Sequence, residues 1–224
     1  EARLPAVHSS LYLQVLKSFA VYPRRLRDLG GQYFPTQKWN ETNAQLDGTI
    51  ERKTTFPSSL HSFIVCGPHF NVGNPFYQSP MPVCTTHRAY LQLDLTSLPD
   101  EYLPRSNYVP ACSLDEYRRR TSNVPWDVSK KCDEYFRLLF RSNLSESDER
   151  TLKSAIYPPE MAHIDGCFSI VFKDTSHLIS LAAISHSVPM DFWVKATGKT
   201  KFRNELADQI PLLDLDAVIK TRTL

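Results

Sequence analysis

Residues 166–187, GCFSIVFKDTSHLISLAAISHS, contain an apolar strand followed closely by an apolar helix. The first part, GCFSIVFK, is rich in β-branched and aromatic residues and predicts a strand. The second part, SHLISLAAISHS at 176–187, is apolar on most sides and predicts a buried helix. A second short helix is expected to begin at Pro189. This stretch therefore contributes both kinds of element to the fold.

Helices and strands alternate irregularly on both sides of this stretch. Strands or hairpins are expected at 33–65, with 62–67 as a compact strand, and also at 90–95 and 151–159; helices are expected at 8–29 as far as Pro23, at 113–120 and at 130–143. The helix at 130–143 is expected because Tyr135, Leu138 and Leu139 would share one face. Irregular alternation favours the α+β class, with a mixed, mostly antiparallel sheet and flanking helices.

Length and composition bound the organisation of the chain. Its 224 residues are 42% hydrophobic, enough to bury a sizeable core. We expect a single domain over 1–224, with a possible subdivision into a Pro-rich, β-containing part (1–126) and an α/β part (127–224). The formal net charge of +2 permits a polyanionic partner without demanding one.

Cysteine usage and hydropathy indicate a cytoplasmic protein. The five cysteines are widely spread and include no C-x-x-C pair, which favours reduced thiols over a disulfide framework. No segment approaches the ~18 apolar residues of a membrane span, so no membrane partner is expected. The sequence begins Glu1-Ala2-Arg3, without an initiator Met or a signal peptide, and we expect it to be part of a longer chain.

A Cys/His pattern at 66–87 raises the possibility of a metal site. Cys66, His69, Cys84 and His87 form C-x-x-H…C-x-x-H, and two Cys and two His can hold zinc. Three prolines interrupt the intervening stretch, and single Cys and His residues are common in protein cores. A buried thiol and a hydrogen-bonded imidazole are the simpler interpretation.

Two catalytic interpretations find little support in the sequence. Asn74-Pro75-Phe76-Tyr77 is one residue away from the N-P-P-Y loop of adenine methyltransferases, but no Gly-rich turn follows an apolar strand upstream. Cys167 and His163 could form a nucleophilic dyad, although nothing in their spacing singles them out. Neither G-x-S-x-G nor H-E-x-x-H occurs.

Basic residues gather in four places and suggest contact with phosphate. The clusters are Arg24, Arg25 and Arg27; Arg118, Arg119 and Arg120; Lys130 and Lys131; and Lys195, Lys199, Lys201 and Arg203. The last cluster surrounds Thr197-Gly198, where backbone amides and hydroxyls can also meet phosphate. Clusters of this kind are also ordinary solvated surface, and arginines at 118–120 would complement a helix C-terminus.

The order of several short motifs resembles one protein family. In the first half these are GPHFNVGNP (67–75), YLPRSNYVP (102–110) and EYRRR (116–120). The second half has Glu149-Arg150-Thr151-Leu152, Ala155-Ile156, Pro158-Pro159, Ala162-His163-Ile164, an apolar helix at 178–187, Asp191-Phe192, Gly198 and Ile210-Pro211. Over roughly 60–215 the chain resembles the target-recognition region of large adenine-specific DNA methyltransferases. That family includes type IIG-like restriction–modification enzymes and methylases of BREX- and DISARM-like phage-defence systems.

This resemblance implies a division of labour between domains. The catalytic domain, with its S-adenosylmethionine site and adenine loop, would lie outside this chain, which would itself hold no cofactor. The present domain would read double-stranded DNA beside that methyltransferase domain, and other defence proteins are possible partners. The chain has His186-Ser187 where many relatives have an Asn-Ser turn, so no role is carried over to that turn.

Side-chain chemistry suggests which residues would contact DNA under this hypothesis. Arginine reads guanine and asparagine reads adenine through two hydrogen bonds each. We expect base contacts from Arg105, Asn107, Arg119 and Arg120, and phosphate contacts from Lys195, Lys199, Lys201 and Arg203. Two alternatives stay open: a protein-interaction module of a defence complex, and a small enzyme with a Cys/His or zinc site at 66–87.

Overall fold

The fold combines helices with mostly antiparallel sheets in a computed structural model that describes residues 9–70 and 78–214. The strands are β1 (Tyr33–Thr36), β2 (Ile50–Thr55), β3 (Ile64–Val65), β4 (Gln78–Pro80), β5 (Tyr90–Gln92), β6 (Ser106–Pro110), β7 (Asn123–Val124), β8 (Asp127–Lys131), β9 (Arg137–Arg141), β10 (Ser154–Tyr157), β11 (Ala162–His163) and β12 (Cys167–Phe172). The helices are α1 (Ser10–Val21), α2 (Glu41–Leu46), α3 (Leu114–Arg120), α4 (Thr175–Ser185), α5 (Val188–Ala196) and α6 (Asn204–Ala207). Short 3₁₀ helices are η1 (Leu26–Gln32), η2 (Leu60–Ser62), η3 (Gly67–His69) and η4 (Cys132–Glu134). The α+β class is confirmed.

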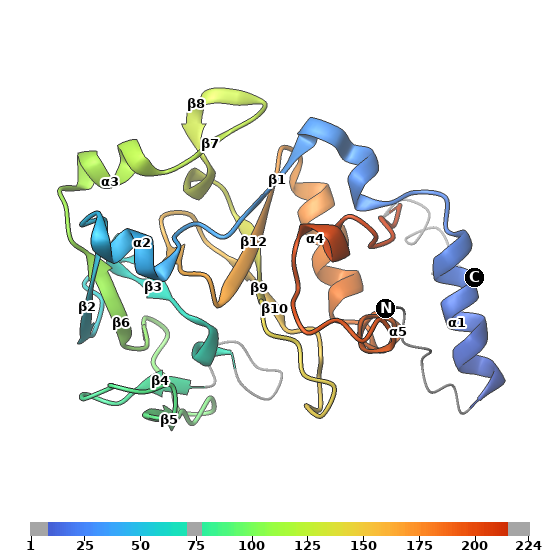
Figure 1. Ribbon diagram of the computed structural model, residues 1–224, viewed down its shortest axis with the longest axis horizontal. Coiled ribbons are helices and arrows are strands. Elements are labelled where there is room, and N and C mark those ends of the chain that lie inside the picture. Colours follow the sequence, from blue (N-terminus) through green and yellow to red (C-terminus); the bar gives the residue numbers. More distant parts are fainter. Residues whose placement is uncertain (1–8, 71–77, 215–224) are drawn as a thin grey trace.

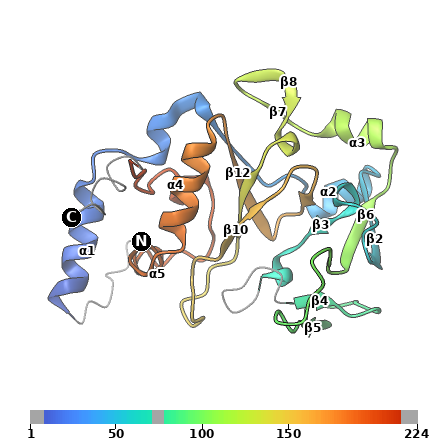
Figure 2. The same ribbon diagram turned by 180° about the vertical axis from the view of Figure 1, so that it is seen from behind.

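A four-stranded antiparallel sheet in the order β1-β12-β9-β10 forms the centre of the molecule. Every residue of β12, CFSIVF, is buried, which explains its unbroken apolar run. Phe168 and Ile170 lie in a core with α4, α5 and α6, whereas Cys167 lies in a second core with β3. Helices α1, α4 and α5 lie on one side of the sheet, and β2, β3 and β6 lie on the other (Figures 1 and 2).

Smaller ladders complete the second side of the molecule. Among the described residues, β2 pairs with β6, β4 with β5 and β7 with β8, all antiparallel, while β3 and β11 are parallel. The pairings β1–β12 and β3–β11 both join residues on the two sides of residue 126, the boundary of the possible subdivision. The two parts of the sequence therefore share their sheets.

Several elements agree with the sequence predictions. Ser9 caps α1, Ser113 caps α3, and both α4 and α5 begin within one residue of their expected positions. In the segment predicted to contain only strands and hairpins, α2 appears as an additional short helix, capped by Asn40. Within the described part of the chain, none of the helices is long and apolar enough to cross a membrane.

The helix predicted at 130–143 is wrong. This segment comprises the end of β8, the turn η4 and the strand β9. Leu138 faces the helical core and Leu139 the opposite core, the period-2 alternation of a strand. The helical core covers one face of β9 and the core around β3 covers the other, so both faces are buried and its apolar residues do not alternate with polar ones. The adjacent apolar residues Leu138 and Leu139, together with Tyr135, therefore have the spacing expected of one face of an amphipathic helix.

Candidate functional site: a polar cleft with a basic edge

A cleft of about 550 Å³ lies between the β2–β6 ladder and the end of the central sheet where β9 ends and β12 begins. It is lined by Glu41, Arg52, Cys66, Gly67, Pro68, Thr85, Thr86, His87, Tyr90, Asn107, Tyr108, Arg141, Asn143, Ile164, Asp165 and Gly166. Its size is in the range of small-molecule and nucleotide sites. The stretch at 66–87 contributes to one wall, so the segment that suggested a metal site does belong to a cavity.

Two glycines hold the walls of the cleft together. A Cβ atom at Gly166 would lie 2.9 Å from the Gly67 nitrogen, and one at Gly67 would lie 3.2 Å from the Gly166 oxygen. The backbones preceding β12 and following β3 therefore touch at a distance that only glycine permits. This contact positions Cys66 beside Asp165 in the lining of the cleft.

A buried hydrogen-bonded network forms the floor of the cleft. The amide nitrogen of Asn107 donates to the Tyr90 hydroxyl at 2.9 Å and lies 3.2 Å from the Cys84 sulfur, while its oxygen accepts from Thr54 at 3.0 Å. The Tyr90 hydroxyl in turn contacts the Cys66 sulfur at 3.0 Å. Asn107, predicted to read bases, therefore already uses its amide group inside the protein.

The geometry around Cys66 and His69 is that of a neutral pair. The Cys66 backbone N–H donates to Nδ1 of His69 at 3.1 Å, so Nε2 carries the proton and donates to the Arg105 carbonyl at 2.9 Å. Burial lowers the pKa of His69 and raises the pKa of the Cys66 thiol to about 12. Both side chains are thereby held in their uncharged forms.

The alternative zinc set at 66–87 is not assembled among the described residues. Cys66 and His69 are in contact, with 3.3 Å between Sγ and Nδ1. The Cys84 sulfur instead accepts a hydrogen bond from the Asn107 amide, and His87 is exposed. In residues 9–70 and 78–214, no three His, Cys, Asp or Glu side chains converge as metal ligands.

The other candidate catalytic groups are equally unreactive or outside the described residues. His163 and Cys167 are both buried; the ring nitrogen Nε2 of His163 contacts the Ser169 hydroxyl at 2.9 Å. Burial lowers the pKa of His163 to about 3 and raises the pKa of Cys167 well above its usual value. Such a pair supplies neither a base nor a thiolate at neutral pH. The near-match Asn74–Tyr77 lies outside the described residues.

One edge of the cleft is basic. Lys201 donates to the side-chain oxygen of Asn143, and these two residues also form an isolated antiparallel bridge. Arg141 lies two residues away on β9, and Lys195 reaches the Asp148 carbonyl at 3.5 Å. The fold therefore brings the segment 195–203 against the end of β9. Of the predicted phosphate contacts, it puts Lys201 directly beside the cleft.

The remaining members of the lysine cluster surround this edge. Lys199 is exposed, and no hydrogen bond of its ammonium group occurs among the described residues. Arg203 is half-buried at the start of α6, and its Nη1 has no hydrogen-bond partner in the described part of the chain. Each lies two residues from Lys201 in sequence, so the segment that contacts Asn143 carries three cationic side chains, of which Arg203 is partly buried.

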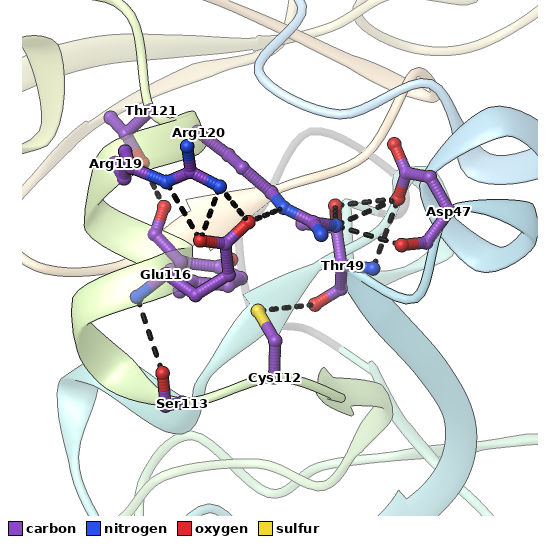
Figure 3. A network of polar contacts seen from close by, with 9 residues as sticks. Asp47, Thr49, Cys112, Ser113, Glu116, Arg119, Arg120 and Thr121 are labelled. Carbon is purple, nitrogen blue, oxygen red and sulfur yellow. Dashed lines mark hydrogen bonds and ion pairs between the residues drawn. The ribbon is translucent and has the colours of Figure 1, made fainter.

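Arg119 and Arg120 lie on α3 and are engaged within the protein. Both guanidinium groups bind the Glu116 carboxylate, Arg119 at 2.7 and 2.8 Å and Arg120 at 2.6 Å. Arg120 also reaches Asp47 at 3.2 Å and the Thr49 hydroxyl at 2.6 Å, which links α3 to the turn before β2 (Figure 3). To contact a base, either arginine would first have to leave this network.

Arg105, the last predicted base contact, precedes β6. Its guanidinium carbon lies 4.2 Å from the centre of the Phe56 ring, and its Nη1 donates to the Pro80 carbonyl at 3.4 Å. The side chain is half-exposed. The contact with Phe56 thus orients the side chain, and Nη1 is the one guanidinium nitrogen of Arg105 with a hydrogen bond in the described part of the chain.

Several residues of the cleft were not singled out by sequence reasoning. Arg52 donates to the Cys84 carbonyl at 3.0 Å, Tyr108 donates to the Glu41 carboxylate, and Asp165 accepts from the Glu41 backbone at 2.8 Å. Arg141 contributes a guanidinium whose Nε has no partner among the described residues. The charged run at 51–53, inside a segment predicted to form strands, is the one signal that could have suggested a solvent-facing cation at Arg52.

No protein-family model matches the chain, and no curated protein aligns with it significantly.

Proposed function

We propose that this chain is a double-stranded DNA recognition domain of an adenine-N6 DNA methyltransferase, in a restriction–modification or phage-defence system. The catalytic domain and the S-adenosylmethionine site lie outside this chain. The proposal assigns DNA binding to the basic edge and the adjoining cleft. It also puts the protein in the cytoplasm, in line with its five free cysteines.

The observation that carries the proposal is the contact between Lys201 and Asn143. It joins a lysine-rich segment to the mouth of a polar cleft, although the two residues lie far apart in sequence. A phosphate backbone following the basic edge would bring base edges toward the cleft. Cations that hold phosphate beside amides that face bases are the usual division of roles at a DNA interface.

Asn143 is well suited to contact a base. Its oxygen accepts from Lys201, so its amide hydrogens point elsewhere and can donate. Arg52, across the cleft, has guanidinium donors beyond the one that binds the Cys84 carbonyl. Arg105 keeps its assigned role as a base contact, while Asn107 supports the floor of the cleft. Arg119 and Arg120 contribute less, because both are paired with Glu116 and Arg120 also with Asp47, and these carboxylates repel phosphate.

The test compares the binding of duplex DNA by the wild-type chain and by Lys199→Ala/Lys201→Ala, measured by fluorescence anisotropy. We expect weaker binding to all sequences and a smaller salt dependence, with the log–log slope reduced by about 0.9 for each phosphate that is no longer neutralised. Lys17→Ala removes an exposed lysine of α1 that does not line the cleft and serves as the control. Unchanged affinity and slope in the double variant would refute the phosphate assignment.

A second candidate function, a protein-interaction module, is favoured by helix α1. None of its residues is buried, and Leu11, Tyr12 and Val21 are exposed by 66, 46 and 79%. Its contacts include the Tyr12 ring against Phe192 of α5, with centroids 4.9 Å apart. Such an apolar helix suits a protein partner, with the methyltransferase domain as the first choice.

Leu11→Ser with Val21→Ser should weaken that association and leave DNA binding by the isolated chain unchanged.

A further inference from the structure

A second cavity, of about 400 Å³, lies between α3, the η4 turn and the loop before β11. Its lining residues are His61, Leu114, Tyr117, Arg118, Lys131, Asp133, Glu134, Pro159 and Glu160. It is separate from the polar cleft, and the two cavities share no lining residue. Helix α3 and the β7–β8 hairpin border this part of the molecule (Figures 1 and 2).

Each carboxylate in the lining of this cavity already has a partner. Asp133 contacts Lys38 at 2.6 Å, Glu134 contacts Lys130 at 3.0 Å, and Glu160 contacts Nε2 of His61 at 3.2 Å. Neither Lys38 nor Lys130 lines the cavity. Lysines outside the cavity therefore match the charges of Asp133 and Glu134, whereas His61 matches the charge of Glu160 only when its imidazole is protonated.

Two cations in the lining have no carboxylate partner among the described residues. Lys131 donates from Nζ to the Thr121 carbonyl at 2.8 Å. In the same part of the chain, the Arg118 guanidinium makes no hydrogen bond or ion pair. Arg118 lies in the last turn of α3, and Lys131 reaches the carbonyl of Thr121, the C-cap of that helix, so both side chains line the same cavity. This leaves a local surplus of positive charge.

A third cation lies in the protein interior behind this wall. Arg137 on β9 is 2% exposed and donates from Nη2 to the Met161 carbonyl, while its Nε and Nη1 have no hydrogen-bond partner in the described part of the chain. Arg137 is near enough to Lys38 and Asp133 to interact with both electrostatically. One carboxylate, Asp133, thus faces two buried cations. In a medium of low dielectric constant, that imbalance acts strongly on a nearby ligand.

Backbone strain also concentrates at this place. Among residues 9–70 and 78–214, the two non-glycine residues with positive φ are Lys38, at 55°, and Glu160, at 76°. The Glu160 backbone N–H donates to the Asp133 carbonyl at 2.7 Å, so both strained residues contact Asp133. Strained backbone of this kind persists where the surroundings over-determine it and is frequent at ligand sites.

We propose that this cavity binds a phosphate group between Arg118 and Lys131, with Lys38 and Arg137 supplying the field from behind. A phosphate carries more charge than a carboxylate and has oxygens enough for both cations at once. The site does not depend on the DNA-recognition function of the cleft. Its phosphate comes from a small phosphate-bearing molecule or from a nucleic-acid backbone, and the experiment distinguishes these sources.

The test is calorimetric titration of the whole chain with inorganic phosphate, at an ionic strength held constant with sodium chloride. The variants are Arg118→Ala, Lys131→Ala and the control Arg119→Ala. Arg118 and Arg119 are both exposed neighbours on α3, but only Arg118 lines the cavity. Amide chemical shifts of residues 114–134 and 159–161 locate the bound phosphate.

We expect the wild type and Arg119→Ala to bind phosphate alike. Arg118→Ala and Lys131→Ala should each bind about tenfold more weakly or worse, the usual effect of losing one charge-assisted hydrogen bond. Displacement of phosphate by a short duplex would identify a nucleic-acid backbone as the source, and no displacement a small molecule; either supports the site. No binding to the wild type, or equal binding by all variants, would overturn it.

Discussion

At the residue scale, two glycines determine how closely the walls of the cleft approach. Gly67 follows β3 and Gly166 precedes β12, and their backbones touch where other residues would need space for a Cβ. The contact is made by main-chain atoms on both sides. Since backbone cannot swing aside as a long side chain can, a larger residue here must move one wall of the cleft.

Gly166→Ala should therefore destabilise the protein by about 1–3 kcal/mol, the typical cost of overpacking a closely packed site. The matched control is Gly31→Ala, where a Cβ would meet no atom within 4 Å and φ is not positive. Urea unfolding monitored by tryptophan fluorescence measures both variants. Equal stability of the two variants would mean that the Gly67–Gly166 contact is not a constraint on the fold.

A second residue-scale prediction concerns the acid sensitivity of the fold. Burial lowers the pKa of His163 to about 3, against 6.5 for an exposed imidazole. Between these values the unfolded chain binds a proton that the folded chain does not, so the native state loses stability as the pH falls below 6.5. By about pH 5 the loss attributable to this ring should reach about 2 kcal/mol.

Urea unfolding at about pH 7.5 and pH 5 measures this loss, with His163→Asn as the comparison. The variant has no imidazole at this position, so its stability should fall less between the two pH values than that of the wild type. His69, whose pKa burial also lowers, contributes to both proteins alike. An identical decrease in both would show that His163 is not the group responsible.

At the element scale, the turn between α4 and α5 depends on one hydroxyl. Ser187 is the N-cap of α5: its side chain accepts from the Met190 backbone at 3.2 Å and donates to the Ile184 carbonyl at 2.7 Å. The hydroxyl thus provides a hydrogen-bond partner for a free carbonyl at the end of α4 and for a free N–H group at the beginning of α5. This is a structural role for the His186-Ser187 turn, to which the family resemblance carried none.

Ser187→Ala should cost about 0.5–2 kcal/mol, the range measured for the removal of helix caps. Ser187→Thr retains the hydroxyl and should recover most of that stability. Thermal unfolding followed by circular dichroism compares the two with the wild type. If both substitutions were equally destabilising, crowding of the turn would be the cause, and not removal of the cap.

Elements whose signals are local could be predicted from the sequence, and elements set by tertiary burial could not. Ser9 and Ser113 mark the starts of α1 and α3 because a capping hydroxyl acts within three residues of itself. Strand β9 was mistaken for a helix because the helices and the β3 region that bury its two faces come from other, separate segments of the sequence. The sequence of β9, RLLFR, does not itself identify the elements that pack against it.

The candidate site divides in the same way. The pairing of Arg119 and Arg120 with Glu116 is implied by their spacing on one helix, three and four residues apart. The contact of Lys201 with Asn143, and the cleft it borders, join segments distant in sequence. The sequence could therefore identify candidate cations for phosphate binding, but only the fold determines which of them are unpaired and adjacent to a cavity.

At the scale of the whole molecule, the chain should fold as one unit and not as two halves divided at residue 126. Strand β1 pairs with β12 along four residues, and β3 pairs with β11, so each part supplies strands to sheets of the other. Residues 127–214 alone should lack a cooperative unfolding transition. Urea titration of that fragment, followed by circular dichroism, checks this; a sharp transition would establish an independent C-terminal domain.

The central claim is that the basic edge and the polar cleft bind double-stranded DNA. Its most direct test is the binding of the whole chain to random-sequence duplexes, measured by anisotropy from about 50 to about 200 mM salt and followed by selection of bound sequences. We predict affinity that decreases steeply with salt, together with enrichment of a defined motif. Absence of binding at the lowest salt concentration would contradict the claim and leave α1 as the principal functional surface.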